Sequence, residues 1–533
     1  KKYIAQDSGT AMRQYTGFCE IYPAFLPDFD NRAHWNGWGV DLANKRYQPA
    51  AMAGISVADV PHLKLDWAFA FPGETRTVGQ PTVVGGRIFV GTYTGKVYSL
   101  DAKSGCLYWV FDTNDSVRTA ITINNVGNFG KAKYAAYFSD STGNTYAVDA
   151  ANGKPIWKTR VETHPNGRLT GAPQLFDGKL FVPVASNEAT AAASPDYKCC
   201  THRGSVVALD AVTGAIIWKS YTVTQEPEAG QKNNIGKQMW GPSGAGVWSA
   251  PTIDVKKNLL YVGTGDNSSD PPTKTSDAII AMDIDSGDIK WVYQGTQNDT
   301  FNISCVTKDR TNCPRSEGPD FDFGSSPILV SLASGKRVLL AAQKSGVLHA
   351  LDPDANGKLL WQAQLGRGGI AGGIMWGPAA DQNNIYVALA DFKPYKIENE
   401  DGTSRWVVDP EKGGGLFAYR IKDGEQIWHV SPVPCIGRSG CSPAQSAAVT
   451  LIPGVVFSGS FDGHLRAYST VDGRVIWKYD TVRSYETTNS IVGNGGAIDG
   501  PGPTIVDGML YVNSGYGRLG GVPGNVLLAF SPD

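Results

Sequence analysis

The chain has 533 residues, with 48 Lys and Arg against 50 Asp and Glu, and a formal net charge of −2. Nucleic-acid-binding proteins usually carry a clear basic excess, so this balance argues against a nucleic acid partner. No apolar run approaches the roughly 18 residues that a membrane-spanning helix needs, so we expect no membrane span.

A short repeat recurs along most of the chain. A glycine is followed four residues later by a tryptophan in seven places, which are Gly105–Trp109, Gly153–Trp157, Gly214–Trp218, Gly287–Trp291, Gly357–Trp361, Gly424–Trp428 and Gly473–Trp477. An alternating apolar run precedes each copy, and an Asp such as Asp101 usually stands four residues before the glycine. This pattern predicts a β-hairpin in which the Asp binds turn N–H groups and the Gly adopts positive φ. We expect each indole to pack between neighbouring sheets, with its N–H bonded to the adjacent sheet.

An eighth copy is split between the two ends of the chain. Residues 526–530 repeat the incoming strand, and residues 63–67 repeat the outgoing strand. Joined, they predict an all-β, eight-bladed β-propeller closed by strands from both termini. We expect one domain over residues 1–533, with an N-terminal extension, 1–58, packed on it. The middle tryptophans are 70 or more residues apart, whereas a blade needs about 40 to 45, so residues 160–375 carry surplus loops that suit a functional site.

Two motifs and the cysteines narrow the function further. Residues 515–520 match GxGxxG, but the following Gly-Val-Pro-Gly cannot open the helix of a dinucleotide site. No CxxCH is present, so we expect no c-type haem attachment and no cytochrome c domain in this chain. Eight cysteines, two of them adjacent, favour an oxidising compartment and predict a periplasmic or secreted protein.

Residues 35–47, Trp-Asn-Gly-Trp-Gly-Val-Asp-Leu-Ala-Asn-Lys-Arg-Tyr, resemble the entry segment of pyrroloquinoline quinone (PQQ) dependent alcohol dehydrogenases. These are eight-bladed propellers with the same turn and tryptophan repeat. Residues 199–205 and 499–525 look most like the polyvinyl alcohol dehydrogenase branch. The resemblance implies a PQQ- and Ca²⁺-dependent enzyme that oxidises polyvinyl alcohol or a bulky secondary alcohol, such as a mycotoxin, to a ketone. A separate cytochrome c would accept the electrons. A sugar or primary-alcohol quinoprotein and a non-catalytic scaffold propeller are the alternatives.

The resemblance also implies which residues bind the cofactor. Trp248, in Gly-Val-Trp-Ser-Ala-Pro, matches the tryptophan that forms the floor under the quinone. Arg118 and Thr170 match contacts to cofactor carboxylates, and Lys344 matches the cation that reaches the quinone oxygens. Core packing for Trp248 and a surface position for Arg118 or Lys344 are the structural alternatives.

A vicinal disulfide covers one face of the quinone in the family, and the adjacent Cys199 and Cys200 are the candidates here. Proximity then pairs Cys305 with Cys313 and Cys435 with Cys441, which leaves Cys19 with Cys106 by elimination.

Glu188 and Asp266, which stands 18 residues after Trp248, match the calcium ligands of the family. A solvated loop carboxylate is the alternative for Glu188. At the usual position of the catalytic base this chain has Asn302, which cannot accept a proton. After a cysteine-bounded insertion, Asp320-Phe321-Asp322 resembles the Asp-x-Asp segment of some relatives. We therefore expect Asp320 to be the base and a third metal ligand, with Asp322 as the runner-up.

Overall fold

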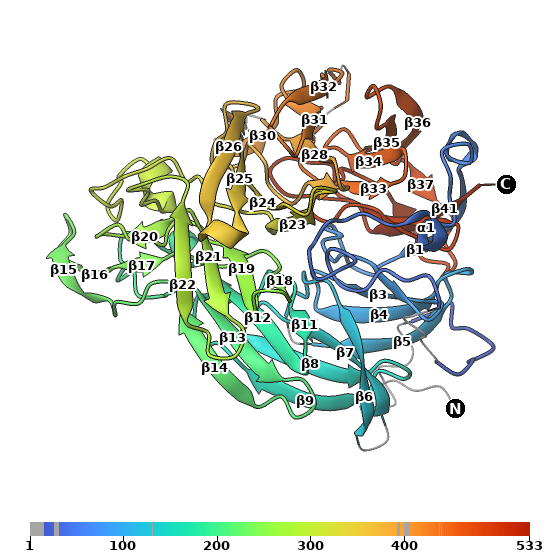
Figure 1. Ribbon diagram of the computed structural model, residues 1–533, viewed down its shortest axis with the longest axis horizontal. Helices are drawn as coiled ribbons and strands as arrows, with labels where there is room; N and C mark the ends of the chain where they lie inside the picture. Colours follow the sequence, from blue (N-terminus) through green and yellow to red (C-terminus); the bar gives the residue numbers. More distant parts are fainter. Residues whose placement is uncertain are drawn as a thin grey trace.

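Eight antiparallel blades, seven with four strands and one with five, stand around a central axis in the computed structural model (Figure 1). The structure describes residues 15–25, 31–113, 115–129, 132–391, 395–398, 404–435, 437–438 and 440–532. The predicted eight-bladed β-propeller is confirmed. No helix in the described part of the chain has the length and apolarity that crossing a bilayer requires.

The first four blades, in order around the ring, are β2 (Thr82–Val84), β3 (Arg87–Gly91), β4 (Lys96–Asp101) and β5 (Leu107–Asp112); β6 (Thr122–Phe129), β7 (Ala132–Ser139), β8 (Asn144–Asp149) and β9 (Pro155–Arg160); β11 (Gln174–Phe176), β12 (Lys179–Ser186), β13 (Ser205–Asp210) and β14 (Ile216–Tyr221), with β10 (Gly167–Arg168) also on β12; and β18 (Thr252–Asp254), β19 (Leu259–Gly263), β21 (Ala278–Asp283) and β22 (Ile289–Gln294).

The last four blades are β23 (Ile328–Ser331), β24 (Arg337–Ala342), β25 (Val347–Asp352) and β26 (Lys358–Gln364); β27 (Ala379–Ala380), β28 (Asn384–Leu389), β31 (Gly415–Arg420) and β32 (Gln426–Val430); β33 (Thr450–Ile452), β34 (Val455–Gly459), β35 (His464–Ser469) and β36 (Val475–Asp480); and β39 (Thr504–Val506), β40 (Met509–Ser514), β41 (Val526–Ser531) and β1 (Lys64–Ala70).

Short ribbons and helices occupy the connections. The ribbons are β15 (Glu228–Lys232) with β16 (Gln238–Gly241), β17 (Ser243–Gly244) with β20 (Asn267–Ser269), β29 (Tyr395–Glu398) with β30 (Ser404–Val407), and β37 (Ser484–Tyr485) with β38 (Gly493–Asn494). The helices are α1 (Ala50–Ala53), α2 (Glu188–Ala191) and the 3₁₀ turns η2 (Val60–His62), η3 (Ile303–Val306) and η4 (Pro353–Ala355). The β15–β16 hairpin projects outward from the ring (Figure 1).

The eighth blade joins the two ends of the chain, as the split repeat predicts. β1 pairs with β41 in antiparallel register from Lys64 opposite Ser531 to Ala70 opposite Val526. Its C-terminal strand is buried along most of its length. This pairing removes the free sheet edges that an open array of blades would expose.

The repeated glycines adopt the expected turn conformation and also contact the preceding blade. All seven have φ between +68° and +77°. A Cβ on Gly287 would lie 2.7 Å from the indole of Trp218, and the other six glycines face the tryptophan of their own preceding blade in the same way. The glycine therefore supplies both the positive φ of the turn and the space for the neighbouring indole.

Six of the eight repeat tryptophans donate their N–H to a backbone carbonyl of the next blade at 2.9–3.2 Å, as predicted: Trp109, Trp157, Trp218, Trp361, Trp428 and Trp477. The prediction fails for Trp67 and Trp291, whose Nε1 atoms are buried with no hydrogen-bond partner in the described structure. Packing of the ring, rather than this hydrogen bond, is the feature that all eight share.

Residues 35–48 run past the first strands of several blades. The carbonyls of Leu42, Ala43 and Lys45 accept N–H groups from β18, β23 and β27 in turn. Arg46 is buried and donates to the Val449 carbonyl and to the Gln80 side chain, so it joins the seventh blade to the first. This segment thereby ties together the strands nearest the axis.

We expect Gly287→Ala to lower the free energy of unfolding by about 1–3 kcal/mol, because the new methyl group meets the Trp218 ring and the positive φ is strained. Chemical denaturation measures the change. Gly178→Ala is the matched control, since Gly178 has φ +71° but no atom within 4 Å of the added Cβ. Equal losses in the two variants would mean that backbone strain alone, and not contact with the indole, requires the glycine.

Candidate active site

Three aspartates gather between the fourth and fifth blades. Asp266 follows β19, while Asp320 and Asp322 precede β23. One carboxylate oxygen from each lies within 4.8 Å of the others. Asp320 and Asp322 are buried, whereas Asp266 is partly exposed. Oxygen ligands at this spacing suit a hard cation such as Ca²⁺.

Lys344, just after β24, supplies the positive charge of this cluster. Its Nζ lies 2.7 Å from Oδ1 of Asp320 and 2.9 Å from Oδ2 of Asp322. Burial opposes the charge of Lys344, but the two carboxylates outweigh burial and raise the pKa of its ammonium above the ordinary value. Lys344 is buried in the cluster, so the alternative of a surface position for it is wrong.

The aspartates differ in how readily they ionise. Burial raises the pKa of Asp320 well above its usual value, although Lys344 opposes the shift. Burial and the neighbouring carboxylates of Asp322 and Asp320 also raise the pKa of Asp266. For Asp322, burial is outweighed by Lys344 and by the backbone N–H of Asp266, which together lower its pKa. One carboxylate is thus held ionised beside two that take up protons easily.

Trp248 connects this cluster to a neighbouring cavity. Its indole N–H donates to Oδ2 of Asp322 at 3.2 Å. Its ring meets Trp376 edge-on, with centroids 5.8 Å apart. A Cβ on Gly324 would collide with the Trp248 ring, so only glycine leaves room for the indole there. The side chain is partly exposed and lines the cavity, so core packing does not describe its position.

The cavity has a volume of about 510 Å³, within the usual range for small-molecule sites. Arg118 and Thr170 line it together with Trp248, as do three arginines that the sequence analysis did not single out: Arg76, Arg168 and Arg518. Within the described residues, no carboxylate lies within ion-pair distance of these four arginines. A polyanionic ligand would supply the missing charge.

Arg118 is held in the cavity wall by an aromatic ring. Its guanidinium lies 4.4 Å from the centroid of Trp376, whose N–H donates to Asp499 at 2.8 Å. Burial lowers the pKa of Arg118 to about 10. A desolvated cation without a carboxylate partner gains from a bound anion, which favours the cofactor-binding interpretation of Arg118 over a surface position.

Glu188 lies apart from the three aspartates. It begins α2 and is fully buried, so it is not a solvated loop carboxylate. Its Oε1 accepts the Tyr197 hydroxyl and the Thr201 amide, and its Oε2 accepts the His202 amide. Its neighbours Asn187 and Thr190 line the cavity. In this structure the Glu188 carboxylate therefore anchors the segment after the adjacent cysteines.

The adjacent cysteines form a buried vicinal disulfide, and the other three predicted disulfides are also present. Trp240 of β16 exchanges backbone hydrogen bonds with Cys199 and Cys200, so the projecting hairpin supports the pair. Asn302, at the position usual for the base, donates to the Ser268 carbonyl at 3.0 Å and approaches Cys199 Sγ at 3.8 Å. The structure thus brings the disulfide to Asn302, but neither cysteine is among the cavity-lining residues.

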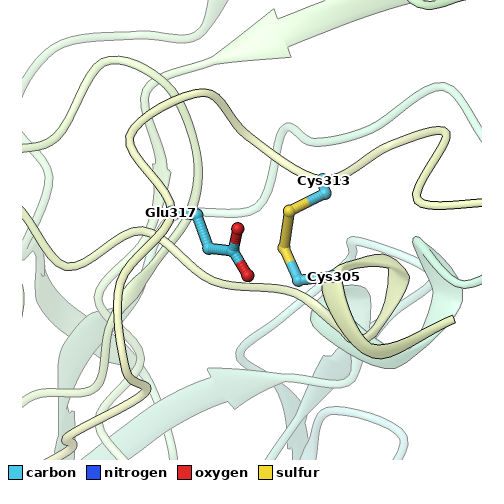
Figure 2. A group of neighbouring side chains, drawn as sticks. All are labelled: Cys305, Cys313 and Glu317. Atoms are coloured by element: carbon cyan, nitrogen blue, oxygen red, sulfur yellow. A yellow bond between two sulfur atoms is a disulfide. The ribbon is translucent and has the colours of Figure 1, made fainter.

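A second group of potential ligands consists of Cys305, Cys313 and Glu317. Figure 2 shows the two sulfurs joined in a disulfide, with the Glu317 carboxylate beside it. Sulfurs in a disulfide have no thiolate to offer a metal, and Glu317 pairs with Arg310. The Cys305–Cys313 disulfide holds the insertion before Asp320 together. Of the two groups found among the described residues, the aspartate cluster is therefore the candidate for metal binding.

Comparisons with known proteins show the family of the chain. Residues 35–364 match a family profile described as PQQ, the β-propeller domain of glucose, ethanol and alcohol dehydrogenases. Polyvinylalcohol dehydrogenase of Pseudomonas sp is 43% identical over 95% of this chain and 78% of its own length. The chain belongs to the PQQ-dependent alcohol dehydrogenase family. It is an oxidoreductase and an alcohol is its substrate class.

Other relatives place the chain within the family. Polyvinylalcohol dehydrogenase of a Sphingopyxis species is 41% identical over 94% of this chain and 76% of its own length. The solved quinohemoprotein alcohol dehydrogenase ADHIIG of Pseudomonas putida has a TM-score of 0.69 at 20% identity, over 94% of this chain and 80% of that one, which shows a shared fold. Residues 343–415 and 412–531 also match the outer membrane protein assembly factor BamB profile. That match covers repeat blades and, of the cluster residues, includes only Lys344.

Some cavity-lining residues were not predicted from the sequence, although they lie in or beside motifs that it contains. Arg168 stands two residues before Thr170 in the same short segment. Tyr516 and Arg518 lie inside the GxGxxG match at 515–520, and both line the cavity of this dehydrogenase. Trp376 carried no signal, because its role depends on contacts made across the ring.

We expect Lys344→Met to destabilise the metal-free protein by about 3–5 kcal/mol at pH 8, because it leaves buried carboxylates without their counter-charge. The loss should be smaller at pH 5. Where the pKa of a carboxyl group is raised in the folded state, the folded state binds more protons than the unfolded state. The free energy of unfolding of the variant therefore increases as the pH falls. Denaturant unfolding at both pH values measures this.

Lys290→Met is the matched control, because Lys290 also faces two carboxylates, those of Asp283 and Asp288, but is exposed. Its effect should stay below about 1 kcal/mol. Equal effects of the two substitutions, or a pH-independent loss in Lys344→Met, would contradict the charge-balance explanation.

Proposed function

We propose that this dehydrogenase uses PQQ and Ca²⁺ to oxidise a secondary alcohol, polyvinyl alcohol or a bulky molecule of the same class, to a ketone. The observation that carries the proposal is the position of Trp248. Its ring lines the arginine-lined cavity, and its N–H binds an aspartate of the neighbouring cluster. A planar anionic cofactor in the cavity would therefore lie close to a metal-binding and proton-accepting group.

The cavity residues fit PQQ, which carries three carboxylates. Arg118, Arg76, Arg168 and Arg518 would bind those carboxylates, and Trp248 would provide an apolar face for the ring system. When bound, the quinone accepts a hydride from the alcohol carbon, while the bound metal acts as a Lewis acid on an oxygen. The protein's part is to orient the cofactor and to accept the hydroxyl proton.

Asp266, Asp320 and Asp322 would hold the metal ion. Their three carboxylates exceed the single charge of Lys344, so a divalent cation would offset the remaining negative charge. Glu188, which the family resemblance also implies as a ligand, is not part of this group, and its carboxylate already accepts hydrogen bonds from Tyr197, Thr201 and His202. We therefore propose the three aspartates as the principal ligands.

Asp320 is the proposed base. Asp322 is committed to the Trp248 indole, the Asp266 amide and Lys344, and its pKa is lowered. Asp320 accepts a hydrogen bond from Lys344 Nζ, and its raised pKa makes it a stronger proton acceptor once ionised. Lys344 would help to hold that carboxylate in place and reach the quinone oxygens.

The electrons would pass to a cytochrome c in the periplasm or outside the cell. Four disulfides support an oxidising location. The vicinal pair Cys199–Cys200 is buried beside Asn302 and does not line the cavity, so its place over a face of the quinone stays a prediction from the family resemblance.

The decisive experiment adds PQQ and Ca²⁺ to purified protein and follows reduction of an artificial dye. We expect faster turnover with polyvinyl alcohol and large secondary alcohols than with short primary alcohols or glucose, and loss of turnover after chelation of Ca²⁺. Asp320→Asn should lower kcat by at least about 10²-fold with PQQ still bound. A preference for glucose would identify a sugar dehydrogenase, and failure to take up PQQ would identify a scaffold propeller.

Arg118→Gln should raise the dissociation constant for PQQ about 10- to 100-fold, because one charge-assisted hydrogen bond in a desolvated wall is lost. Titration followed by quinone absorbance measures this. Arg483→Gln is the control: Arg483 also lies on an aromatic ring, that of Tyr479, but is exposed. Unchanged PQQ affinity in Arg118→Gln would place the cofactor carboxylates elsewhere.

A further inference from the structure

Asp320 has a backbone conformation that most residues avoid. Its φ is +60°, in the left-handed region. Asp tolerates this region better than most residues, but the conformation still costs free energy and persists only where the surroundings hold it. The backbone at Asp320 sets the direction of the carboxylate that meets Lys344, so the contacts that hold this backbone matter to the site.

The side chain of Asp299 makes those contacts. Its Oδ1 accepts the N–H of Asp320 at 3.2 Å, and its Oδ2 accepts the N–H of Phe321 at 2.9 Å. Asp299 is fully buried in the connection between β22 and η3. One carboxylate therefore binds the amide groups on both sides of the Asp320 Cα.

Gly318 leaves room for the Asp299 carboxylate beside residues 318–321. A Cβ on Gly318 would collide with Oδ1 of Asp299. The Gly318 N–H donates to the Thr300 carbonyl at 3.1 Å, which brings residues 318–321 alongside residues 299–300. The glycine thus allows a close approach that any other residue would obstruct.

We propose that Asp299 is a positioning residue for alcohol oxidation: it clamps the amides of Asp320 and Phe321 and so aims the Asp320 carboxylate at Lys344. The inference rests on the proposed function, in which Asp320 is the base. Asp299 touches neither Lys344 nor the Trp248 indole in the described contacts, so it acts through Asp320.

Asp277 provides a matched control within the same region. It is also a fully buried aspartate and lies next to Asp299, but in the described structure its oxygens accept no backbone N–H group. Substitution of Asp277 therefore alters a buried carboxyl group beside Asp299 without removing a backbone contact of residues 320 and 321.

The first test compares Asp299→Asn with Asp277→Asn in protein loaded with PQQ and Ca²⁺. An Asn side chain has one acceptor oxygen and must lose at least one of the two amide contacts. We expect kcat to fall about 10- to 100-fold in Asp299→Asn, with KM for the alcohol within about twofold, because the base is misplaced while binding is kept. Asp277→Asn should keep kcat within about twofold. Equal kcat values in Asp299→Asn and wild type would overturn the proposal.

The second test measures amide hydrogen exchange at residues 320 and 321 without any substrate. We expect exchange of both amides to accelerate at least about tenfold in Asp299→Asn and to be unchanged in Asp277→Asn. Unchanged exchange in Asp299→Asn contradicts the clamp even if turnover falls. If Asp299→Asn does not fold, Gly318→Ala replaces it, since that substitution crowds the same carboxylate without deleting it.

A double variant separates positioning from general loss of structure. In the Asp320→Asn background, Asp299→Asn should cause no further loss of residual turnover, because the residue it positions is already disabled. A further tenfold loss would mean that Asp299 acts by another route. If the wild type oxidises no alcohol, the proposed function fails, whereas the hydrogen-exchange test still decides whether Asp299 clamps the segment.

Discussion

Contact between the tryptophan of one blade and the turn glycine of the next holds the ring together. Trp218 against Gly287 is typical of it: the glycine lacks a Cβ, and the indole occupies the space that this leaves. Seven blade junctions use this contact, and at the eighth Trp477 packs on Phe530 instead, so every blade depends on its neighbour and on closure of the ring. The pairing of β1 with β41 makes that closure. The site depends on it, since its residues come from loops of many blades.

The active site buries several ionisable side chains, and neighbouring residues of opposite charge partly balance them. Asp320 and Asp322 share the ammonium of Lys344, and Asp322 also binds the Trp248 indole. The adjoining cavity has the opposite character, with four arginines that have no carboxylate at ion-pair distance in the described structure. An anionic cofactor and a divalent cation would complete these two halves. Trp248 contacts both, because its ring lines the cavity and its N–H binds Asp322.

Much of the fold could be predicted because the repeat is local. The turn residues and the tryptophan lie within nine residues of each other, as in Asp101 to Trp109, and hairpin geometry depends on such short-range chemistry. The hydrogen bonds of the indoles were less predictable. Among the described residues Trp291 finds no acceptor for its N–H, because the acceptor would belong to another blade and its position is a tertiary property.

The sequence by itself determined the eight-bladed ring, its closure by both termini, the disulfide pairs, and the family to which the chain belongs. Only the tertiary structure decided that Asp266, Asp320, Asp322 and Lys344 form one cluster, that Glu188 is engaged elsewhere, and that Asp299 supports Asp320. The reason is physical. Turn and strand preferences act over a few residues, whereas charge balance and hydrogen bonding in a buried site depend on groups that are distant in sequence and meet only when the ring closes.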